Sequence, residues 1–558
     1  MTHKIREVYI VHHSHTDVGY TDLQEQVIYN QANNIRRAVE LIENGIKNNT
    51  PQKDLKWNCE TWYCVEQFFK MATEEEKEKF FDLVKKGNIG LSANYLNFND
   101  LADCKYLKEK IHTMQEICGE QGIQIKTAMI ADINGISMGQ RDAMIENGVE
   151  FLYTNIHTHH GMYPLYQNQK PYFWENEDGK RLLVWNGEHY NLGNALGIVL
   201  NKNVNFMTEN YFGKKNGDVA GLLENLHTNL SASIKEYEEN GYPYDFYITS
   251  VSGVFSDNAP INPAIADTVE LFNEKYGEEV TMHMVTLQEL YERIRDKVQD
   301  APVYRGAIND WWGNGVGSTP YAVKHYKEAV RLNRICDRLE EKTGVHNEEL
   351  IQAYGDNSLL YAEHTWGHSA TVTNLDMRKT SYASKAHEAA AMRKNEQCHK
   401  LGDILRYYNL SGKVKAVSTS HAKRIFPVEF YVETMSLPAV KVTDDKTKQE
   451  MEVQLSAHPR GVLVSFLAEF EPMEEKTFTY EEQPAPSQTL FTRTAWVGAE
   501  RVRDIVNTYD PESYKLPYGL ENDFFQIKWK VGEGITSFYN KKAEIEMCKS
   551  GLETFFTP

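Results

Sequence analysis

Three histidines and an aspartate lie within six positions near the N-terminus, in the stretch VHHSHTDVGYTD at residues 11–22. Side chains alternate across an extended chain, so His13, His15 and Asp17 share one face. Imidazole and carboxylate groups together are a typical ligand set for zinc and similar divalent metals. Gly19 then permits a tight turn away from this face. The pattern predicts two or three ligands of a metal site at a strand end, with the remaining ligands supplied by distant parts of the chain.

Three later segments could supply the remaining ligands. Asp132 ends the strongly apolar run MIADI, where a buried and unpaired charge costs on the order of several kcal/mol. We therefore expect Asp132 to meet a cation, a cluster of donors or water. The segment EHTWGHS offers His364 and His368 at an expected helix end. The segment NIHTHHGMY is more typical of a plain loop, and it contains His157, His159 and His160.

The elements that must position these groups alternate between strands and helices over about the first 300 residues. Runs such as REVYIVHH, IKTAMIADI and DFYITSVSG predict strands, whereas amphipathic segments such as 24–45 and 73–87 predict helices. The alternation predicts a parallel sheet covered by helices, either a barrel or a doubly wound sheet. Several predicted strands end in polar side chains, and in such folds the active site gathers at the carboxyl ends of the strands.

Three domains are expected along the chain. Residues 1–305 carry the alternating α/β pattern. Residues 306–410 contain long amphipathic segments that predict a helical bundle. Residues 411–558 turn to short β-rich pieces that predict a β-sandwich.

Composition excludes several classes of protein. The 558 residues include 79 acidic and 60 basic side chains, a net charge of −19 that is dispersed along the chain. No basic stripe with interleaved aromatics is present, which argues against nucleic acid as a partner. The N-terminus lacks the apolar segment of a signal peptide, and no stretch approaches the roughly 20 apolar residues that span a bilayer. Seven scattered cysteines without a CxxC pair indicate reduced thiols. We predict a cytoplasmic protein without a membrane partner, and leave a homo-oligomer open.

Several of these motifs together resemble glycoside hydrolase family 38, the α-mannosidases. HHSHTDVGYTD resembles the family motif HSHxDxGW, KGNIGLSANYLNFND resembles its strand followed by an acidic residue, and AMIADINGISMGQ resembles its nucleophile segment. LLYAEHTWGHSATV stands in the place of its late histidine motif, and the order and spacing match across roughly residues 5–400. Three differences stand out. Tyr20 replaces the usual Trp, Asp-Ile-Asn-Gly replaces Asp-Pro-Phe-Gly, and Glu363-His364-Thr365 replaces His-His-Asp.

The resemblance implies a fold and a set of site residues. The fold would be an N-terminal seven-stranded (β/α) barrel, then a helical bundle, then a C-terminal β-sandwich that is expected to be truncated, because the family's domain usually continues further. A Zn²⁺ ion would be held by His15, Asp17, Asp132 and His364, with His368 in reserve for the last. Asp132 would be the nucleophile, and Asp257 lies where the acid/base segment falls. The expected substrate-binding residues are Tyr20, Glu60, Asp100 and Trp312.

The implied activity is metal-dependent, retaining hydrolysis of α-mannoside-like glycosides. The metal would bind two neighbouring sugar hydroxyls while Asp132 attacks the anomeric carbon and Asp257 protonates the leaving oxygen. Two alternatives stay open. A metal-dependent carbohydrate deacetylase would use bound water against an acyl carbon, and a non-catalytic protein derived from a glycosidase would bind carbohydrate without turnover.

Overall fold

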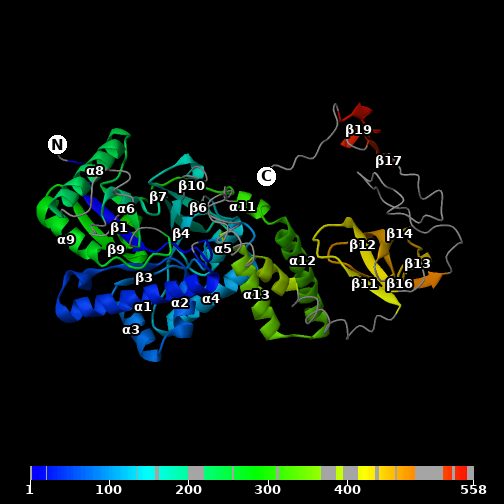
Figure 1. The fold of residues 1–558 in the computed structure, drawn as a ribbon, viewed down its shortest axis with the longest axis horizontal. Helices are drawn as coiled ribbons and strands as arrows, with labels where there is room; N and C mark the ends of the chain where they lie inside the picture. The colour runs from blue at the N-terminus through cyan, green and yellow to red at the C-terminus, as the bar shows by residue number, and fades with distance from the viewer. Residues whose placement is uncertain are drawn as a thin grey trace. The chain divides into compact units, whose positions relative to one another are not determined.

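The structure is a computed structural model, and it divides the chain into two compact units, Met1–Ile404 and Leu405–Pro558 (Figure 1). Each unit is described by itself. Among the described residues, no helix combines the length and the hydropathy that a bilayer crossing requires. The described residues are 3–20, 22–133, 135–156, 163–198, 219–253, 257–308, 313–365, 385–393, 412–433, 439–458, 461–483, 519–530 and 534–548.

The first sheet of the N-terminal unit is built around β1 (Glu7–His13). The strand β8 (Phe246–Ser252) pairs in parallel with the whole of β1. On the other side of β1, β9 (Thr281–Val285) pairs with the first five residues and β2 (Trp57–Cys59) pairs with the last, both in parallel. The strand β3 (Ile89–Leu91) extends the sheet beyond β2. All five strands are thus parallel, so their carboxyl ends lie at one edge of the sheet.

The second sheet has a parallel part and an antiparallel edge. The strands β4 (Thr127–Asp132), β5 (Phe151–Ile156) and β7 (Arg181–His189) follow one another in parallel. The strand β6 (Lys170–Glu175) then pairs with β7 in the antiparallel sense, and β10 (Val303–Tyr304) pairs in parallel with β6 at the edge.

The two sheets curl around one apolar interior. Tyr9 and Val11 of β1 belong to the same buried cluster as Tyr153 of β5, Trp185 of β7 and Ile248 of β8. Their alternate neighbours on β1 pack instead against the outer helices, as a period of two requires. The predicted parallel α/β architecture is confirmed. The pairings among the described residues give two curled sheets, and they do not by themselves make one closed ring of seven strands.

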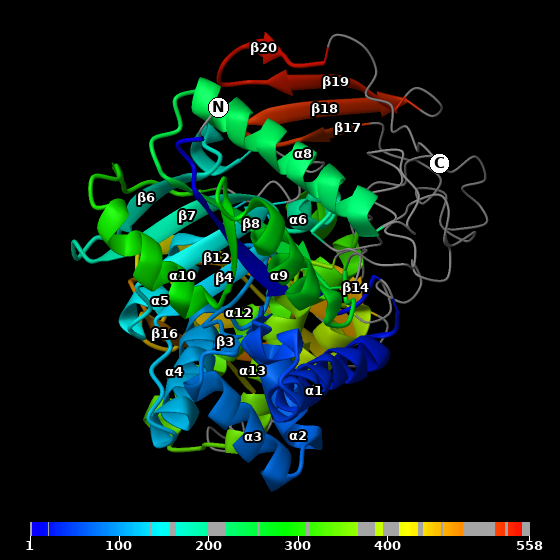
Figure 2. The same cartoon turned by 90° about the vertical axis from the view of Figure 1, so that its left-hand side faces the viewer.

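Helices lie outside the strands of this unit (Figures 1 and 2). Those expected at 24–45 and 73–87 form α1 and α3, and α3 begins with a capping box in which Thr73 and Glu76 bond each other's backbone N–H. The helices are α1 (Gln24–Asn48), α2 (Trp62–Met71), α3 (Glu74–Lys85), α4 (Cys104–Glu120), α5 (Met138–Glu146), α6 (Leu192–Leu196), α8 (Val219–Glu239), α9 (Ala264–Tyr276) and α10 (Leu287–Ile294), with 3₁₀ turns at Pro51–Asp54, Pro164–Tyr166 and Arg295–Lys297.

A helical region follows the sheets. It contains α11 (Asn314–Gly317), α12 (Pro320–Thr343), α13 (Glu348–Ala362) and helical residues 385–393. The end of α13 is tied to the chain after β3 by an antiparallel backbone bridge between Phe98 and Glu363. This bridge delivers the residues after α13 to the carboxyl edge of the first sheet.

The C-terminal unit contains two three-stranded antiparallel sheets in the orders β11-β16-β13 and β12-β15-β14. Val442, Val464, Phe466 and Phe478 from both sheets share one buried core, as in a β-sandwich. A four-stranded sheet, β17-β18-β19-β20, follows, and the predicted domain borders after residues 305 and 410 stay predictions. The strands are β11 (Lys413–Val417), β12 (Arg424–Glu433), β13 (Ala439–Asp444), β14 (Val453–His458), β15 (Gly461–Phe470), β16 (Glu475–Gln483), β17 (Gly519–Glu521), β18 (Phe525–Lys530), β19 (Gly534–Asn540) and β20 (Ile545–Glu546).

Candidate active site

Four of the predicted site residues meet at the carboxyl ends of the strands. His15 and Asp17 follow β1, Asp132 is the last residue of β4, and His364 follows α13. One nitrogen or carboxylate oxygen from each lies within 4.8 Å of those of the other three. All four side chains are buried. The structure thus brings together the four residues that the family resemblance selects.

The facing atoms of this cluster are those that bind metals. His364 Nε2 lies 3.1 Å from Asp17 Oδ1 and 3.0 Å from Asp132 Oδ2. His15 Nε2 lies 3.4 and 3.7 Å from the same two carboxyl groups. Within the described part of the chain, His15 Nε2, Asp17 Oδ1 and Asp132 Oδ1 are buried without a hydrogen bond. Two imidazoles and two carboxylates so arranged fit a divalent cation, because buried polar atoms otherwise carry a large desolvation penalty.

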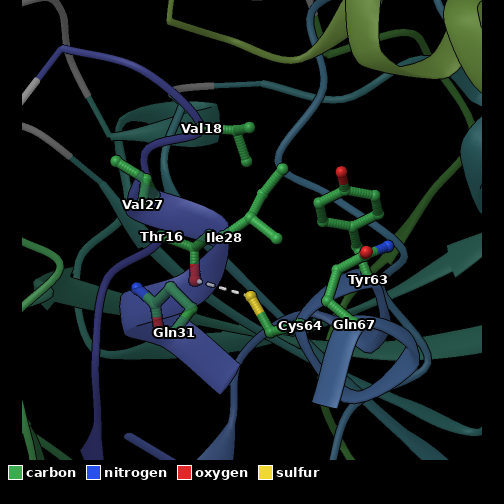
Figure 3. Close-up of a pocket in the computed structure, with 8 residues that line it drawn as sticks. All are labelled: Thr16, Val18, Val27, Ile28, Gln31, Tyr63, Cys64 and Gln67. Atoms are coloured by element: carbon green, nitrogen blue, oxygen red, sulfur yellow. Dashed lines mark hydrogen bonds between the residues drawn. The ribbon is translucent and has the colours of Figure 1, made fainter. Parts of the chain in front are cut away.

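The segment that carries His15 and Asp17 is anchored by packing on the side opposite the cluster. Thr16 and Val18 point away from the cluster into a small pocket between α1 and α2, where Thr16 Oγ1 lies 3.7 Å from Cys64 Sγ (Figure 3). Alternation therefore turns His15 and Asp17 to the opposite side. The residues that line this pocket are Thr16, Val18, Val27, Ile28, Gln31, Tyr63, Cys64 and Gln67.

An asparagine after β8 clamps the same stretch. The Asn258 backbone N–H donates to His15 O at 2.8 Å, and Asn258 Nδ2 donates to Asp17 O at 2.9 Å. Asn258 Oδ1 accepts from the Asp17 N–H at 3.2 Å and from Gln31 Nε2 at 2.7 Å. These bonds fix the backbone of both ligand residues and hold Asp257 beside them.

Asp132 has an unusual backbone. Its φ is +75°, which non-glycine residues rarely adopt and which is found at functional sites when the surroundings impose it. Burial raises the pKa of its carboxyl, but the nearby imidazoles of His15 and His364 outweigh burial and hold the pKa well below its usual range. Asp132 is therefore ionised, as a nucleophile or a metal ligand must be.

Two buried carboxylates lie behind the histidines. His15 Nδ1 donates to Glu60 Oε1 at 3.0 Å, and His13 Nδ1 donates to Glu60 Oε2 at 2.6 Å. His364 Nδ1 lies 2.9 Å from Glu363 Oε1. Burial acts to raise the pKa of Glu60 and of Glu363, but the charge of the adjacent imidazoles holds both well below the usual range.

Asp257 lies at the margin of the cluster, and the pKa of its carboxyl is raised, whereas that of Asp132 is lowered. Burial, and then the negative charge of Asp17, raise the pKa of its carboxyl to about 6. Tyr190 Oη donates to Asp257 Oδ1 at 2.8 Å, and the Tyr190 ring centroid lies 4.4 Å from that of His15. This environment suits a carboxyl that must hold a proton near neutral pH.

The remaining predicted residues have mixed placements. Glu60 is buried against the histidines, Tyr20 is buried in the large apolar cluster of this unit, and Asp100 is exposed. The substrate-binding role expected for these three stays a prediction. The residues Trp312, His368, His157, His159 and His160 lie outside the described part of the chain.

Sequence reasoning missed several residues that position the site, among them Asn258, Tyr190 and Lys385. The side chain of Asn97 donates to Glu60 Oε1 at 2.7 Å. The sequence signal for Asn97 was its place in a run of polar side chains after a predicted strand. For Glu363 the signal was the departure from the family's late motif. For the others no local pattern points to the site, because their contacts join segments far apart in the chain.

Comparison with known proteins decides the family. Residues 6–307, more than half of the chain, match the family model described as "Glycosyl hydrolases family 38 N-terminal domain". The chain belongs to glycosyl hydrolase family 38. Three of the four clustered residues, His15, Asp17 and Asp132, lie within the matched domain, and His364 follows it. No curated protein sequence matches the chain.

Solved structures show the family 38 fold beyond the matched domain. An α-mannosidase from Enterococcus faecalis V583 is 12% identical with a TM-score of 0.59, and the alignment covers 97% of this chain and 61% of that one. A glycosyl hydrolase family 38 protein from Enterococcus faecalis is 11% identical with a TM-score of 0.56, covering 98% of this chain and 60% of that one. The chain therefore spans about three fifths of the length of these relatives. At this identity the likeness concerns the fold.

Proposed function

We propose that this family 38 chain is a metal-dependent, retaining glycoside hydrolase that acts on α-mannoside-like glycosides. The observation that supports it most is the buried cluster of His15, Asp17, Asp132 and His364 at the carboxyl edge of the sheets. We further propose that β8, β1, β2, β3, β4, β5 and β7 form a seven-stranded barrel. Residues of β8, β1, β4, β5 and β7 share one buried core, and β2 and β3 continue the sheet from β1. The cytoplasmic location predicted from the sequence stays a prediction.

The four residues would hold one divalent ion, and the mixed nitrogen and oxygen donors favour zinc. When bound, such an ion would engage two neighbouring hydroxyls of the sugar and orient the ring. The two histidines present Nε2 and the two aspartates present carboxylate oxygens to this position.

Two carboxyl groups of the chain take the two roles of the reaction, nucleophile and acid/base. The ionised carboxylate of Asp132 attacks the anomeric carbon and forms a glycosyl ester as the bond to the leaving oxygen breaks. The carboxyl of Asp257, whose pKa is about 6, gives its proton to that oxygen. Asp257 then takes a proton from water, and the water oxygen displaces Asp132 from the sugar. Opposite pKa shifts in one site are the arrangement that this double displacement requires.

Replacement of Asp132 by Asn tests the nucleophile. The amide is nearly isosteric, so the fold should persist while kcat on aryl α-mannosides falls by at least about 10³-fold, since the attacking charge is lost. Asp82→Asn on α3 is the matched control, because Asp82 is an exposed aspartate that pairs with Lys86. A panel of aryl α- and β-glycosides with metal analysis of the purified protein gives the sugar and the ion. Wild-type turnover by Asp132→Asn would contradict the proposal, and acetate release without glycoside cleavage would favour the deacetylase alternative.

A further inference from the structure

We propose that Glu60 and Glu363 are positioning residues, each of which holds one cluster histidine with Nδ1 protonated and Nε2 turned to the metal. This inference rests on the proposed function, because it concerns the same site. It gives these two acidic residues a role behind the ligand histidines, in place of the substrate-binding role that the sequence predicted for Glu60. Their role would be to fix the ligand geometry before the ion arrives.

Glu60 is held rigidly before it meets His15. Its Oε1 accepts from the Thr16 backbone N–H at 3.1 Å and from Asn97 Nδ2 at 2.7 Å, as well as from His15 Nδ1 at 3.0 Å. Its Oε2 accepts from His13 Nδ1 at 2.6 Å. Both oxygens are thus satisfied inside the protein, and the side chain is fully buried. A carboxylate with so many donors has little freedom to move, so it fixes the imidazole that bonds to it.

Glu363 is supported in the same way on the other side of the cluster. While Oε1 lies 2.9 Å from His364 Nδ1, Oε2 accepts from the Thr365 backbone N–H at 3.1 Å and from the Thr365 hydroxyl. Lys385 Nζ lies 3.6 Å from Oε2 and donates to the backbone carbonyl of Glu363 at 3.0 Å. This lysine also donates to the Leu360 carbonyl at 2.7 Å, so it ties Glu363 to the end of α13.

The two arrangements have the same consequence for the histidines. An ionised carboxylate can only accept, so Nδ1 of each imidazole carries a proton that points to its glutamate. Nε2 is then the nitrogen whose lone pair a metal would take, after loss of any proton that Nε2 carries in the metal-free protein. In both residues Nε2 is the atom that faces Asp17 and Asp132. A carboxylate behind a ligand histidine fixes its tautomer and raises its basicity toward a metal.

Burial makes a merely structural role a poor explanation. Glu60 and Glu363 are almost completely inaccessible, and a buried carboxylate is costly unless it is fully paired. Neutral acceptors such as Gln would satisfy Nδ1 at a smaller desolvation cost. Two carboxylates in equivalent positions, one for each ligand histidine, indicate that negative charge at these positions contributes to the site.

Metal affinity of the full-length protein is the decisive readout. We expect Glu363→Leu and Glu60→Leu to weaken zinc binding by about 10- to 100-fold in a chelator competition, with Glu363→Gln in between. The absorption spectrum of the Co²⁺-substituted protein should change as well, since the ligand geometry loosens. Glu363 is the sharper test, because Glu60 also holds His13.

Two control variants separate this role from general stability. Glu388→Gln changes another buried acid, which lies 3.9 Å from Lys385, and should leave zinc affinity unchanged. Thr73→Ala removes the cap of α3 and should lower stability without weakening zinc binding. Circular dichroism identifies any variant that does not fold, and the Gln variants provide the milder substitution.

The outcomes distinguish the two proposals. If the wild-type protein binds no metal, the proposed function fails and this inference fails with it. If the wild-type protein binds zinc and cleaves glycosides but the folded Leu and Gln variants keep wild-type affinity and an unchanged Co²⁺ spectrum, only the positioning role is overturned. Weakened binding confined to the Glu60 and Glu363 variants supports it.

Discussion

Asp132 and Asp257 are aspartates of one buried site whose environments shift their pKa values in opposite directions. Asp132 faces the imidazoles of His15 and His364, which overcome the effect of burial and keep its carboxyl ionised. Asp257 faces Asp17 and Asp132 as well as the Tyr190 hydroxyl, and burial with like charge raises its pKa to about 6. Their roles therefore follow from their neighbours, not from their residue type.

The pKa of Asp257 predicts a pH profile. Below about pH 6 its carboxyl is protonated and can serve as an acid, and above that value it ionises. We expect kcat/KM for an alkyl glycoside to fall as pH rises through this range. Asp257→Asn should cost about 10²–10⁴-fold with the alkyl glycoside but far less with a dinitrophenyl glycoside, whose leaving group needs no proton. An equal loss with both substrates would show that Asp257 is not the acid.

At the scale of elements, the segment after α13 is held by a buried charge network. Lys385 lies between Glu363 and Glu388, with Nζ 3.6 and 3.9 Å from their carboxyl oxygens. It donates to the last carbonyls of α13, where a positive charge is favoured. Burial raises the pKa of Glu388 to about 7, even though Lys385 and Gln24 act to lower it. Glu388 is therefore the member of the network that titrates near neutral pH.

The Glu388→Gln variant should become more stable relative to the wild type as pH rises. Below pH 4.5, the ordinary pKa, Glu388 is neutral in both the folded and unfolded states and the substitution changes little. Between pH 4.5 and about 7 the unfolded state ionises first, so the wild type loses stability that Gln keeps. The difference in unfolding free energy should level off above pH 7 at about 3–4 kcal/mol or less. Urea unfolding of both metal-free proteins at pH 5 and pH 8 measures it, and an equal difference at both pH values would contradict the assignment.

The sequence largely predicted the individual strands and helices, but it did not predict the long-range contacts that join them. The strands expected from REVYIVHH, IKTAMIADI and DFYITSVSG are β1, β4 and β8, because β-branched and aromatic runs suit buried parallel strands. The bridge between Phe98 and Glu363 left no local signal, since it joins a loop after β3 to the end of α13. Local pattern therefore predicted which segments end near a site, but not which of them touch.

At the scale of the whole molecule, the cluster draws its residues from both ends of the N-terminal unit. Spacing predicted that His15 and Asp17 share a face, whereas His364 was selected over His368 only through the family resemblance. Glu363 and Lys385 act through tertiary contacts that no spacing rule contains. A metal between these residues would connect the first strand, the fourth strand and the helical region, so its binding should depend on the complete fold of the unit.

Anomalous diffraction at the zinc edge tests the central claim most directly. In crystals of the full chain grown with zinc, we predict one peak about 2.0–2.2 Å from a donor atom of each of His15, Asp17, Asp132 and His364. Zinc bound elsewhere with no peak among these four side chains would contradict the claim.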